Sequence, residues 1–397
     1  MDPKSGWTPK SGWTPKSGWM PKSGWTPRRI QPLKTTPLRL GQESEKTGAE
    51  DEMCFGSLWI TAKVWLIHHT RGFAIGCRLG SAYYGTTSRS GLASEPRFEQ
   101  TIVSALGFQG VGLHSGAEVT LRLVPAPAGS GIVFRRTDLD DFEIPAPGRN
   151  VAKVSYATSL MRQGVLISTT EHLLSALVGL GVDNVIVEVD NLEVPILDGS
   201  SKPYVDAMLS VGMKVQRRKR EYIRILKEVE VREGTKFIGV YPGDGYGIHY
   251  TIDFPDPIGH ETFIGDLEAG AYAELIAPAR TFGFREDEAM LRDMGLIRGA
   301  TDACAIIIGK GVVQNGPLRF TDEFVRHKVL DLIGDLALAG RRIWGNVVAE
   351  RAGHAMHTAL VQRLMRDRSA WVLAHRYEDE VVEAKAPGLR ALTSLQA

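Results

Sequence analysis

The sequence predicts an α+β protein made of two similar domains, each a sheet layered with helices, at residues 97–214 and 219–390. Two observations carry this prediction. Both halves contain short segments with the alternation of strands, followed by a helix, a strand and a second helix. Each helix also has an apolar face that another element must cover, so two such layers packed together would enclose a site between them.

The composition is that of a globular protein with room for a core. Of 397 residues 43% are hydrophobic, and 47 Lys and Arg balance 46 Asp and Glu to a net charge of +1, so no nucleic-acid partner is predicted. Three cysteines without a CxxC pair indicate a reducing, cytoplasmic compartment. The apolar stretch 55–67 is interrupted by Lys63 and too short for a bilayer of about 30 Å, so no transmembrane segment is predicted.

The first 96 residues differ from the rest. The hexapeptide "PKSGWT" begins at Pro3, Pro9, Pro15 and Pro21, with Met20 replacing Thr in the third copy. Repeats this short and this rich in Pro, Gly and Ser cannot build a packed core. We therefore interpret residues 1–96 as a disordered or non-native extension outside the fold, and a tryptophan-bearing binding tail as the alternative.

Local patterns predict the elements of the first domain. Residues 118–124, "EVTLRLV", alternate as a half-buried strand does. Residues 168–181 form a helix with hydroxyl caps at its start and glycines at its end, followed by a strand at 182–190 and a helix at 199–212. The basic run "KVQRRKR", 214–220, is interpreted as a solvated linker between the domains rather than a nucleic-acid patch.

The second domain repeats this plan. Its predicted strands are residues 222–231, 236–242, 247–254 and 343–350, and its main predicted helices are a long one from a cap at Thr321 to Gly340 and another at 354–365.

The long helix carries a polar face of its own. In "FVRHKVLDLIGD", His327, Asp331 and Asp335 follow one another at intervals of four beside an apolar stripe. Such a pair of His and Asp is usually a surface hydrogen bond, but the other half's helix brings Glu171 and His172 in its first turn. Two histidines and one aspartate are the three protein ligands of a catalytic zinc, whose fourth position stays open.

Other polar residues near these helices have two interpretations each. Glu171 points about 100° away from His172, which suits a general base, or it merely favours the helix N-terminus. His354 follows Gly353 at a helix start and could enter a cleft, whereas His357 is predicted at the surface. His114, in a glycine-rich turn, is a competing ligand or a structural residue.

Six motifs together resemble one enzyme family. "GVGLHSG", "STTEHLLSALVGLGVDNVIVEVD", "PILDGSS", "ARTFGF", "FVRHKVLDLIGD" and "AGHAMH", in this order, closely resemble the UDP-3-O-acyl-N-acetylglucosamine deacetylases of lipid A biosynthesis. The resemblance runs from about Arg97 to about Pro387. It implies two α+β domains packed around a zinc site, and an enzyme that removes the N-acetyl group of UDP-3-O-acyl-N-acetylglucosamine.

The resemblance also implies residue roles. It implies that His172, His327 and Asp331 bind the zinc and that Glu171 is the base. Lys328 and His354 would supply positive charge at the reacting carbonyl, and Asp335 would orient His354. Thr281 would donate a hydrogen bond to the oxyanion, and the substrate would contact Phe282, Phe254 and Lys236. Either Glu171 or His354 would protonate the departing amine.

Some features remain open at this stage. The family often has a "GGS" turn where this chain reads "RGATDACA", 298–305, so the preference for acyl-chain length does not carry over. A zinc amide hydrolase of another acylated nucleotide sugar, or a metal-free UDP-sugar-binding protein on the same fold, are the alternatives. A peripheral membrane contact through the acylated substrate is left open, and the oligomeric state is not predicted.

Overall fold

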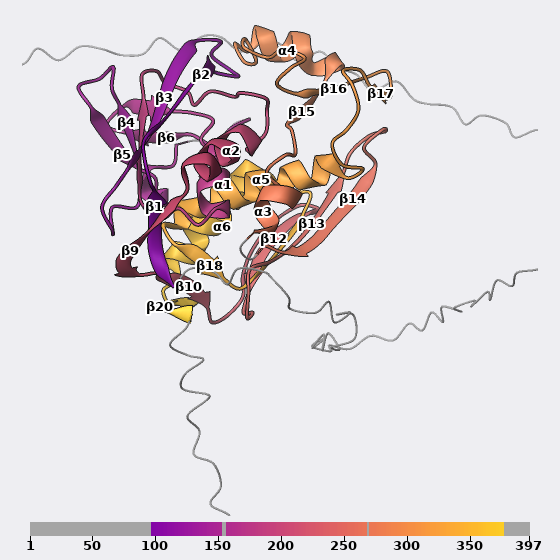
Figure 1. Ribbon diagram of the computed structural model, residues 1–397. Helices are drawn as coiled ribbons and strands as arrows, with labels where there is room; N and C mark the ends of the chain where they lie inside the picture. The colour runs from indigo at the N-terminus through magenta and orange to yellow at the C-terminus, as the bar shows by residue number, and fades with distance from the viewer. Residues whose placement is uncertain (1–96, 153–155, 268–269, 377–397) are drawn as a thin grey trace, which may run out of the picture. The chain divides into compact units, whose positions relative to one another are not determined.

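The computed structural model of this protein describes residues 97–152, 156–267 and 270–376 (Figure 1). The repeats of residues 1–96 and the end of the second predicted domain, 377–390, lie outside the described residues, so the predictions for them stay predictions. The boundary between the predicted domains stays a prediction as well.

The elements of the first half are β1 (Phe98–Ile102), β2 (Leu106–Val111), β3 (Glu118–Pro125), β4 (Ile132–Arg136), β5 (Phe142–Pro145), β6 (Leu160–Arg162), β7 (Val165–Ile167), α1 (Glu171–Gly179), β8 (Val185–Val189), α2 (Lys202–Val211) and β9 (Met213–Lys219). Those of the second half are β10 (Tyr222–Ile225), β11 (Val229–Glu233), β12 (Lys236–Tyr241), β13 (Gly247–Asp253), β14 (His260–Asp266), α3 (Ala271–Leu275), β15 (Phe282–Phe284), α4 (Glu288–Asp293), β16 (Ile306–Gly309), β17 (Val312–Val313), α5 (Glu323–Leu336), β18 (Arg342–Trp344), β19 (Asn346–Glu350), α6 (His354–Arg366) and β20 (Trp371–Ala374).

Two five-stranded sheets confirm the α+β class and share one topology. The first has the order β2-β3-β8-β4-β5 and the second the order β11-β12-β19-β13-β14. In each sheet the third and fourth strands in this order run parallel and all other neighbours run antiparallel. In each half a helix of the pair α1 and α5 comes before the central strand, β8 or β19, and a helix of the pair α2 and α6 follows that strand. The two halves are therefore copies of one plan.

Helices α1, α5 and α6 lie between the two sheets, whereas α4 lies outside them beside β15 and β16 (Figure 1). α5 packs on α1 and on strands β13 and β14, while α6 packs on α5 and on strands β11 and β12. A glycine allows the α1–α5 contact to be close: a Cβ at Gly334 of α5 would lie 2.0 Å from the carbonyl oxygen of Glu171. The first turn of α1 therefore rests directly on the backbone of α5.

Burial follows the predicted alternation in β3. Its Val119, Leu121 and Leu123 are buried, whereas Thr120 and Arg122 between them are exposed. These apolar side chains belong to a hydrophobic core that also includes residues of α1 and α5.

The interpretation of 214–220 as a linker was wrong. Residues 213–219 form β9, which pairs antiparallel with β1 more than 100 residues earlier in the chain. Most of its side chains are exposed, so it lacks an apolar stripe, but Gln216 faces inward and bonds Asn184 and the Ala126 carbonyl. A strand whose inward-facing side chains are polar lacks the alternation of apolar and polar residues by which strands are predicted.

Two predicted strands are each divided between sheets. Residues 222–231 become β10 and β11, and 343–350 become β18 and β19, with β10, β18 and β20 forming a separate three-stranded sheet. The second division falls at Gly345, where a Cβ would lie 2.6 Å from the carbonyl oxygen of Tyr241, so only glycine fits the bend.

The predicted N-terminal caps of α1 and α5 were also wrong. Thr170 precedes α1, but its hydroxyl donates to the carbonyl of Thr158, and α5 follows Asp322 rather than Thr321. After Leu336 one turn of 3-10 helix carries the chain on to the predicted end at Gly340. Within the described ranges every helix is too short or too polar to cross a membrane.

Candidate metal centre and active site

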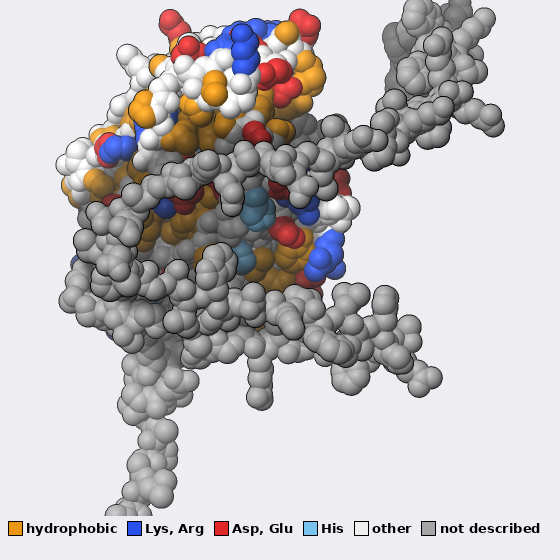
Figure 2. Space-filling view, turned by 90° about the vertical axis from the view of Figure 1, so that its right-hand side faces the viewer, with side chains coloured by type: hydrophobic (Ala, Val, Ile, Leu, Met, Phe, Trp, Pro, Cys, Tyr) orange, Lys and Arg blue, Asp and Glu red, His pale blue; other side chains and the backbone are white. Residues whose placement is uncertain are grey.

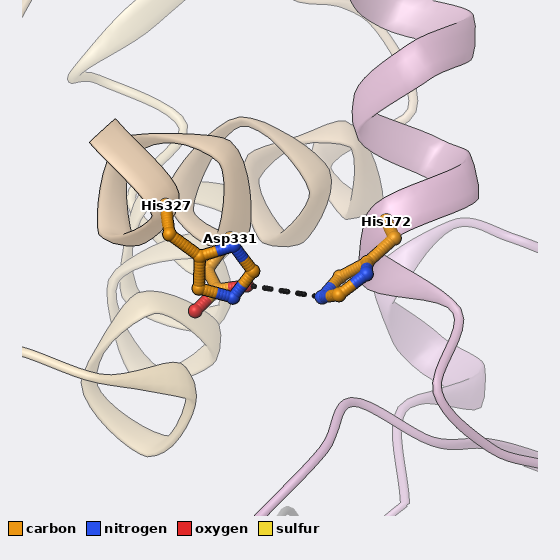
Figure 3. Close-up of side chains that lie close together, drawn as sticks. All are labelled: His172, His327 and Asp331. Carbon is orange, nitrogen blue, oxygen red and sulfur yellow. Dashed lines mark ion pairs between the residues drawn. The ribbon is translucent and has the colours of Figure 1, made fainter. Parts of the chain in front are cut away.

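The three predicted ligands come together between α1 and α5 (Figure 3). His172 is the second residue of α1, and His327 and Asp331 lie one turn apart on α5. Nε2 of His172 lies 3.6 Å and Nε2 of His327 lies 3.3 Å from Oδ1 of Asp331. All three side chains are buried, so two imidazole nitrogens and a carboxylate oxygen point at one small volume shielded from water.

The surroundings prepare His327 and Asp331 to bind a cation. Nδ1 of His327 lies 3.2 Å from the Ala279 carbonyl oxygen. Because a carbonyl oxygen only accepts hydrogen bonds, the ring proton is on Nδ1 and the lone pair of Nε2 is free to bind a cation. Burial lowers the pKa of His327 to about 3, which keeps the ring neutral. Burial also acts to raise the pKa of Asp331, but the adjacent side chains of His327 and Lys328 outweigh it and hold this pKa well below its usual range.

His172 provides a further sign that a metal ion fits here. Its buried Nδ1 makes no hydrogen bond within the described part of the chain, and its Nε2 lies 3.6 Å from Oδ1 of Asp331. At 3.6 Å, Nε2 and the Asp331 oxygen are too far apart for a good hydrogen bond, but a cation between them could contact both. A set of two imidazoles and one carboxylate is a ligand set that zinc and related transition metals take.

Glu171 lies beside this set. Its Oε2 accepts a hydrogen bond from the backbone N–H of Thr158 at 3.0 Å, and its Oε1 lies 3.8 Å from Nε2 of His354. Burial raises the pKa of Glu171, while the nearby His354 opposes the rise. A buried carboxylate with a raised pKa can both take up and release a proton.

His354 begins α6 and connects the metal set to Asp335. Its Nε2 is 3.8 Å from Oδ2 of Asp331, and its Nδ1 is 2.7 Å from Oδ2 of Asp335. Burial acts to lower the pKa of His354, but the carboxylates of Asp335 and Asp331 outweigh it and raise the pKa to about 9. The ring is therefore an imidazolium at neutral pH, with one N–H on Asp335 and the other facing Glu171 and Asp331.

Two of the remaining predicted residues border an apolar cavity of about 190 Å³. Thr281 and Phe282 line it, and the Phe282 ring lies 6.3 Å from the ring of His327. Phe254 packs against Phe282 at 5.5 Å, and Nζ of Lys328 lies 2.5 Å from Oδ2 of Asp331. The cavity therefore opens beside the metal set, and Figure 2 shows histidine side chains in a hollow of this face.

Lys236 lies apart from these residues. It opens β12 opposite Glu233 and is exposed, and its side chain makes no hydrogen bond or ion pair in the described ranges. His114 lines the cavity, but it belongs to neither group of potential metal ligands found among the described residues, so the alternative of His114 as a ligand gains no support.

Sequence reasoning missed two polar residues and misplaced a third. Thr158 donates its hydroxyl to Oδ1 of Asp335 at 2.5 Å, and the hydroxyl of Tyr250 lies 3.0 Å from Nε2 of His357. His357 is fully buried, so its prediction as a surface residue was wrong. One signal for His357 was present, because it lies one turn after His354 and α6 packs that face against α5. No local pattern marked Thr158 or Tyr250.

Comparisons with known proteins agree with this geometry. The family model described as UDP-3-O-acyl N-acetylglycosamine deacetylase matches residues 99–366. A protein of that name from Solibacter usitatus is 52% identical over 276 residues, which are 69% of this chain and 94% of that protein. Proteins of the same name from Anaeromyxobacter dehalogenans (43% over 295 residues, 74% and 94%) and Myxococcus xanthus (45% over 287 residues, 71% and 91%) also match. The resemblance found in the sequence is confirmed, and the chain belongs to the UDP-3-O-acyl N-acetylglycosamine deacetylase family.

Proposed function

We propose that the chain binds one zinc ion through His172, His327 and Asp331 and hydrolyses the N-acetyl group of UDP-3-O-acyl-N-acetylglucosamine, the committed step of lipid A biosynthesis. The observation that carries this proposal is the convergence of these three side chains beside buried Glu171 and charged His354. When bound, zinc supplies a Lewis acid and lowers the pKa of a water molecule to about 7.

Glu171 and His354 divide the proton transfers. Glu171, with its raised pKa, takes a proton from the attacking water as a new C–O bond forms at the acetamide carbon. The C–N bond then breaks, acetate leaves, and the sugar nitrogen takes up a proton. The imidazolium of His354 holds a proton at Nε2, 3.8 Å from Glu171, so we assign it as the donor.

The developing oxyanion is stabilised by the groups around it. The charged His354 and Lys328 both face Asp331, so they supply positive charge where the carbonyl oxygen becomes negative. The Thr281 hydroxyl adds a hydrogen bond, because its backbone is fixed by a bond from its N–H to the Gly199 carbonyl at the edge of the cavity.

The substrate would extend from the metal set in two directions. The apolar cavity beside Phe282 suits the acyl chain, and residues 300–302 and 305 of the "RGATDACA" segment line it, so this segment bears on chain length. Phe254 and the exposed ammonium of Lys236 suit the nucleotide and its phosphates. We further propose that the enzyme acts in the cytoplasm, where the nucleotide sugar would be met, and touches a membrane only through its acylated substrate.

Metal analysis combined with acetate release tests this function. Purified protein should hold about one zinc per chain and release acetate from UDP-3-O-acyl-N-acetylglucosamine, and chelation followed by zinc should remove and restore the rate. A metal-free protein that binds the substrate without turnover would favour the UDP-sugar-binding alternative. Preferential turnover of another acylated nucleotide sugar in a substrate panel would favour the other zinc amide hydrolase.

A further inference from the structure

Asp335 accepts hydrogen bonds from more groups than the proposed mechanism uses. Its Oδ1 accepts from the hydroxyl of Thr158 at 2.5 Å. Its Oδ2 lies 2.7 Å from Nδ1 of His354 and 2.8 Å from Nδ1 of His357. Asp335 and His357 are both fully buried, so water does not compete for these bonds. The carboxylate that contacts His354 is therefore shared with a second imidazole.

The neighbours of His357 determine which of its nitrogens carries the proton. Burial lowers the pKa of His357, so the ring is neutral at pH 7 and has one N–H. Nδ1 faces an ionised carboxylate, which only accepts, whereas Nε2 faces the Tyr250 hydroxyl at 3.0 Å, which can donate. The Tyr250 hydroxyl has a single proton, which the Ala352 carbonyl at 2.8 Å and Nε2 of His357 share, so both contacts fix the position of the hydroxyl. The N–H of His357 is thereby directed at Asp335.

These distances describe hydrogen bonds rather than a second metal site. Asp335, His354 and His357 offer ligand atoms close enough to one another to hold an ion. However, separations of 2.7 and 2.8 Å between a nitrogen and an oxygen are those of N–H···O⁻ bonds, with no space for an ion between them.

We propose that His357 is a positioning residue for the deacetylation: its Nδ1–H, held by Tyr250, fixes the Asp335 carboxylate so that Oδ2 stays on Nδ1 of His354. Without this donor the described partners of Asp335 are the Thr158 hydroxyl and His354 itself, so the carboxylate that orients the His354 ring is held less firmly. The inference rests on the proposed role of His354 in proton transfer.

Three substitutions of His357 separate positioning from packing. His357→Leu keeps an apolar volume and removes both nitrogens. In His357→Asn the Nδ2 amide can occupy the place of Nδ1 and donate to Asp335, whereas in His357→Gln the amide reaches the place of Nε2 beside Tyr250 instead. We expect kcat to fall about 10- to 100-fold in the Leu and Gln variants, with KM within about twofold of wild type, and Asn to restore most of kcat. Zinc content should stay at one per chain in all three.

A double-mutant cycle then tests whether His357 acts through His354. We expect His354→Ala to lower kcat about 10²- to 10⁴-fold, and His357→Leu added to it to lower kcat by less than about twofold more. Additive losses, or equal rates in the Asn and Gln variants, would overturn the inference. If His357→Leu does not fold, the comparison of Asn with Gln decides alone. Near-normal turnover in His354→Ala would instead refute the proposed role of His354, and a slow His354→Ala with a normal His357→Leu would refute only this inference.

Discussion

Because α1 and α5 contact each other closely at Gly334, we expect a single added methyl group at this position to have a large effect on stability and activity. A Cβ at Gly334 would lie 2.0 Å from the carbonyl oxygen of Glu171 and 2.9 Å from its Cα, both backbone atoms. Because the contacted atoms belong to the backbone, no side-chain rotation can relieve the clash. The helices must therefore separate by about 1 Å before the distance from the Cβ to the carbonyl oxygen reaches 3.0 Å. The displacement would act directly on the next residue, His172, and move it away from His327 and Asp331.

We expect Gly334→Ala to destabilise the protein and to impair the site more strongly. Alanine favours a helix interior by about 1 kcal/mol over glycine, but overpacking a closely packed contact costs about 1–3 kcal/mol. The free energy of unfolding should therefore fall by up to about 2 kcal/mol, and Tm by several degrees. A misplacement of about 1 Å at the reacting groups should lower kcat on the order of 10²-fold.

The assay is thermal unfolding, zinc content and acetate release for Gly334→Ala beside a matched control. Gly107→Ala suits the control, because Gly107 lies in β2 and its Cβ would meet nothing within 4 Å. We expect the control to match wild type in all three measurements. If Gly334→Ala keeps wild-type zinc content, kcat and Tm, then α1 and α5 do not determine the metal site through this contact.

Further predictions address the metal, the proton transfers and the N-terminal extension. Asp331→Ala should lose zinc and turnover together, because two ligands close a catalytic site poorly; full zinc occupancy with normal turnover would contradict the assignment. The profile of kcat/KM against pH should be bell-shaped. The rate should fall at low pH as Glu171 becomes protonated, and at high pH as His354, whose pKa is about 9, loses its proton. Asp335→Asn removes a carboxylate that raises the His354 pKa, so the basic limb should move to lower pH and the acid limb should move less; an unmoved basic limb would exclude the pair from the mechanism. Deleting residues 1–95 should leave turnover and Tm nearly unchanged, since the family match begins at residue 99, and a large loss of either would place these residues in the fold.

Residues close in the sequence were easier to predict than contacts across the fold. The spacing of His327 and Asp331 on one helix, and the position of His172 beside Glu171, were readable because one helical turn brings them together. Strand β9 was missed because its partner β1 lies far away and its inward contacts are polar. The family resemblance supplied the remaining candidate residues, which helix and strand patterns alone would not have selected.

The polar network around Asp335 shows why spacing alone is insufficient. Thr158 lies outside any predicted element and reaches Asp335 from 177 residues away, and Tyr250 lies in a strand whose pattern only marks it as buried. A hydroxyl that joins such a network has no distinct spacing, because its partner is set by how the sheets and helices pack. His357 was misplaced for the same reason: the face of α6 that meets α5 depends on a helix–helix register that the sequence of α6 does not contain.

The register of α1 against α5 has a physical origin in one glycine. The two halves share one topology, so α1 and α5 are equivalent helices, yet α1 contributes its first turn to the site and α5 its second and third. Gly334 permits the start of α1 to touch α5 one turn after Asp331, and this brings His172 opposite Asp331. Three side chains therefore provide the metal ligands, but Gly334, which has no side chain, determines where these ligands meet. A search for sites between repeated domains should accordingly include glycines on the facing helices as well as the histidines and carboxylates.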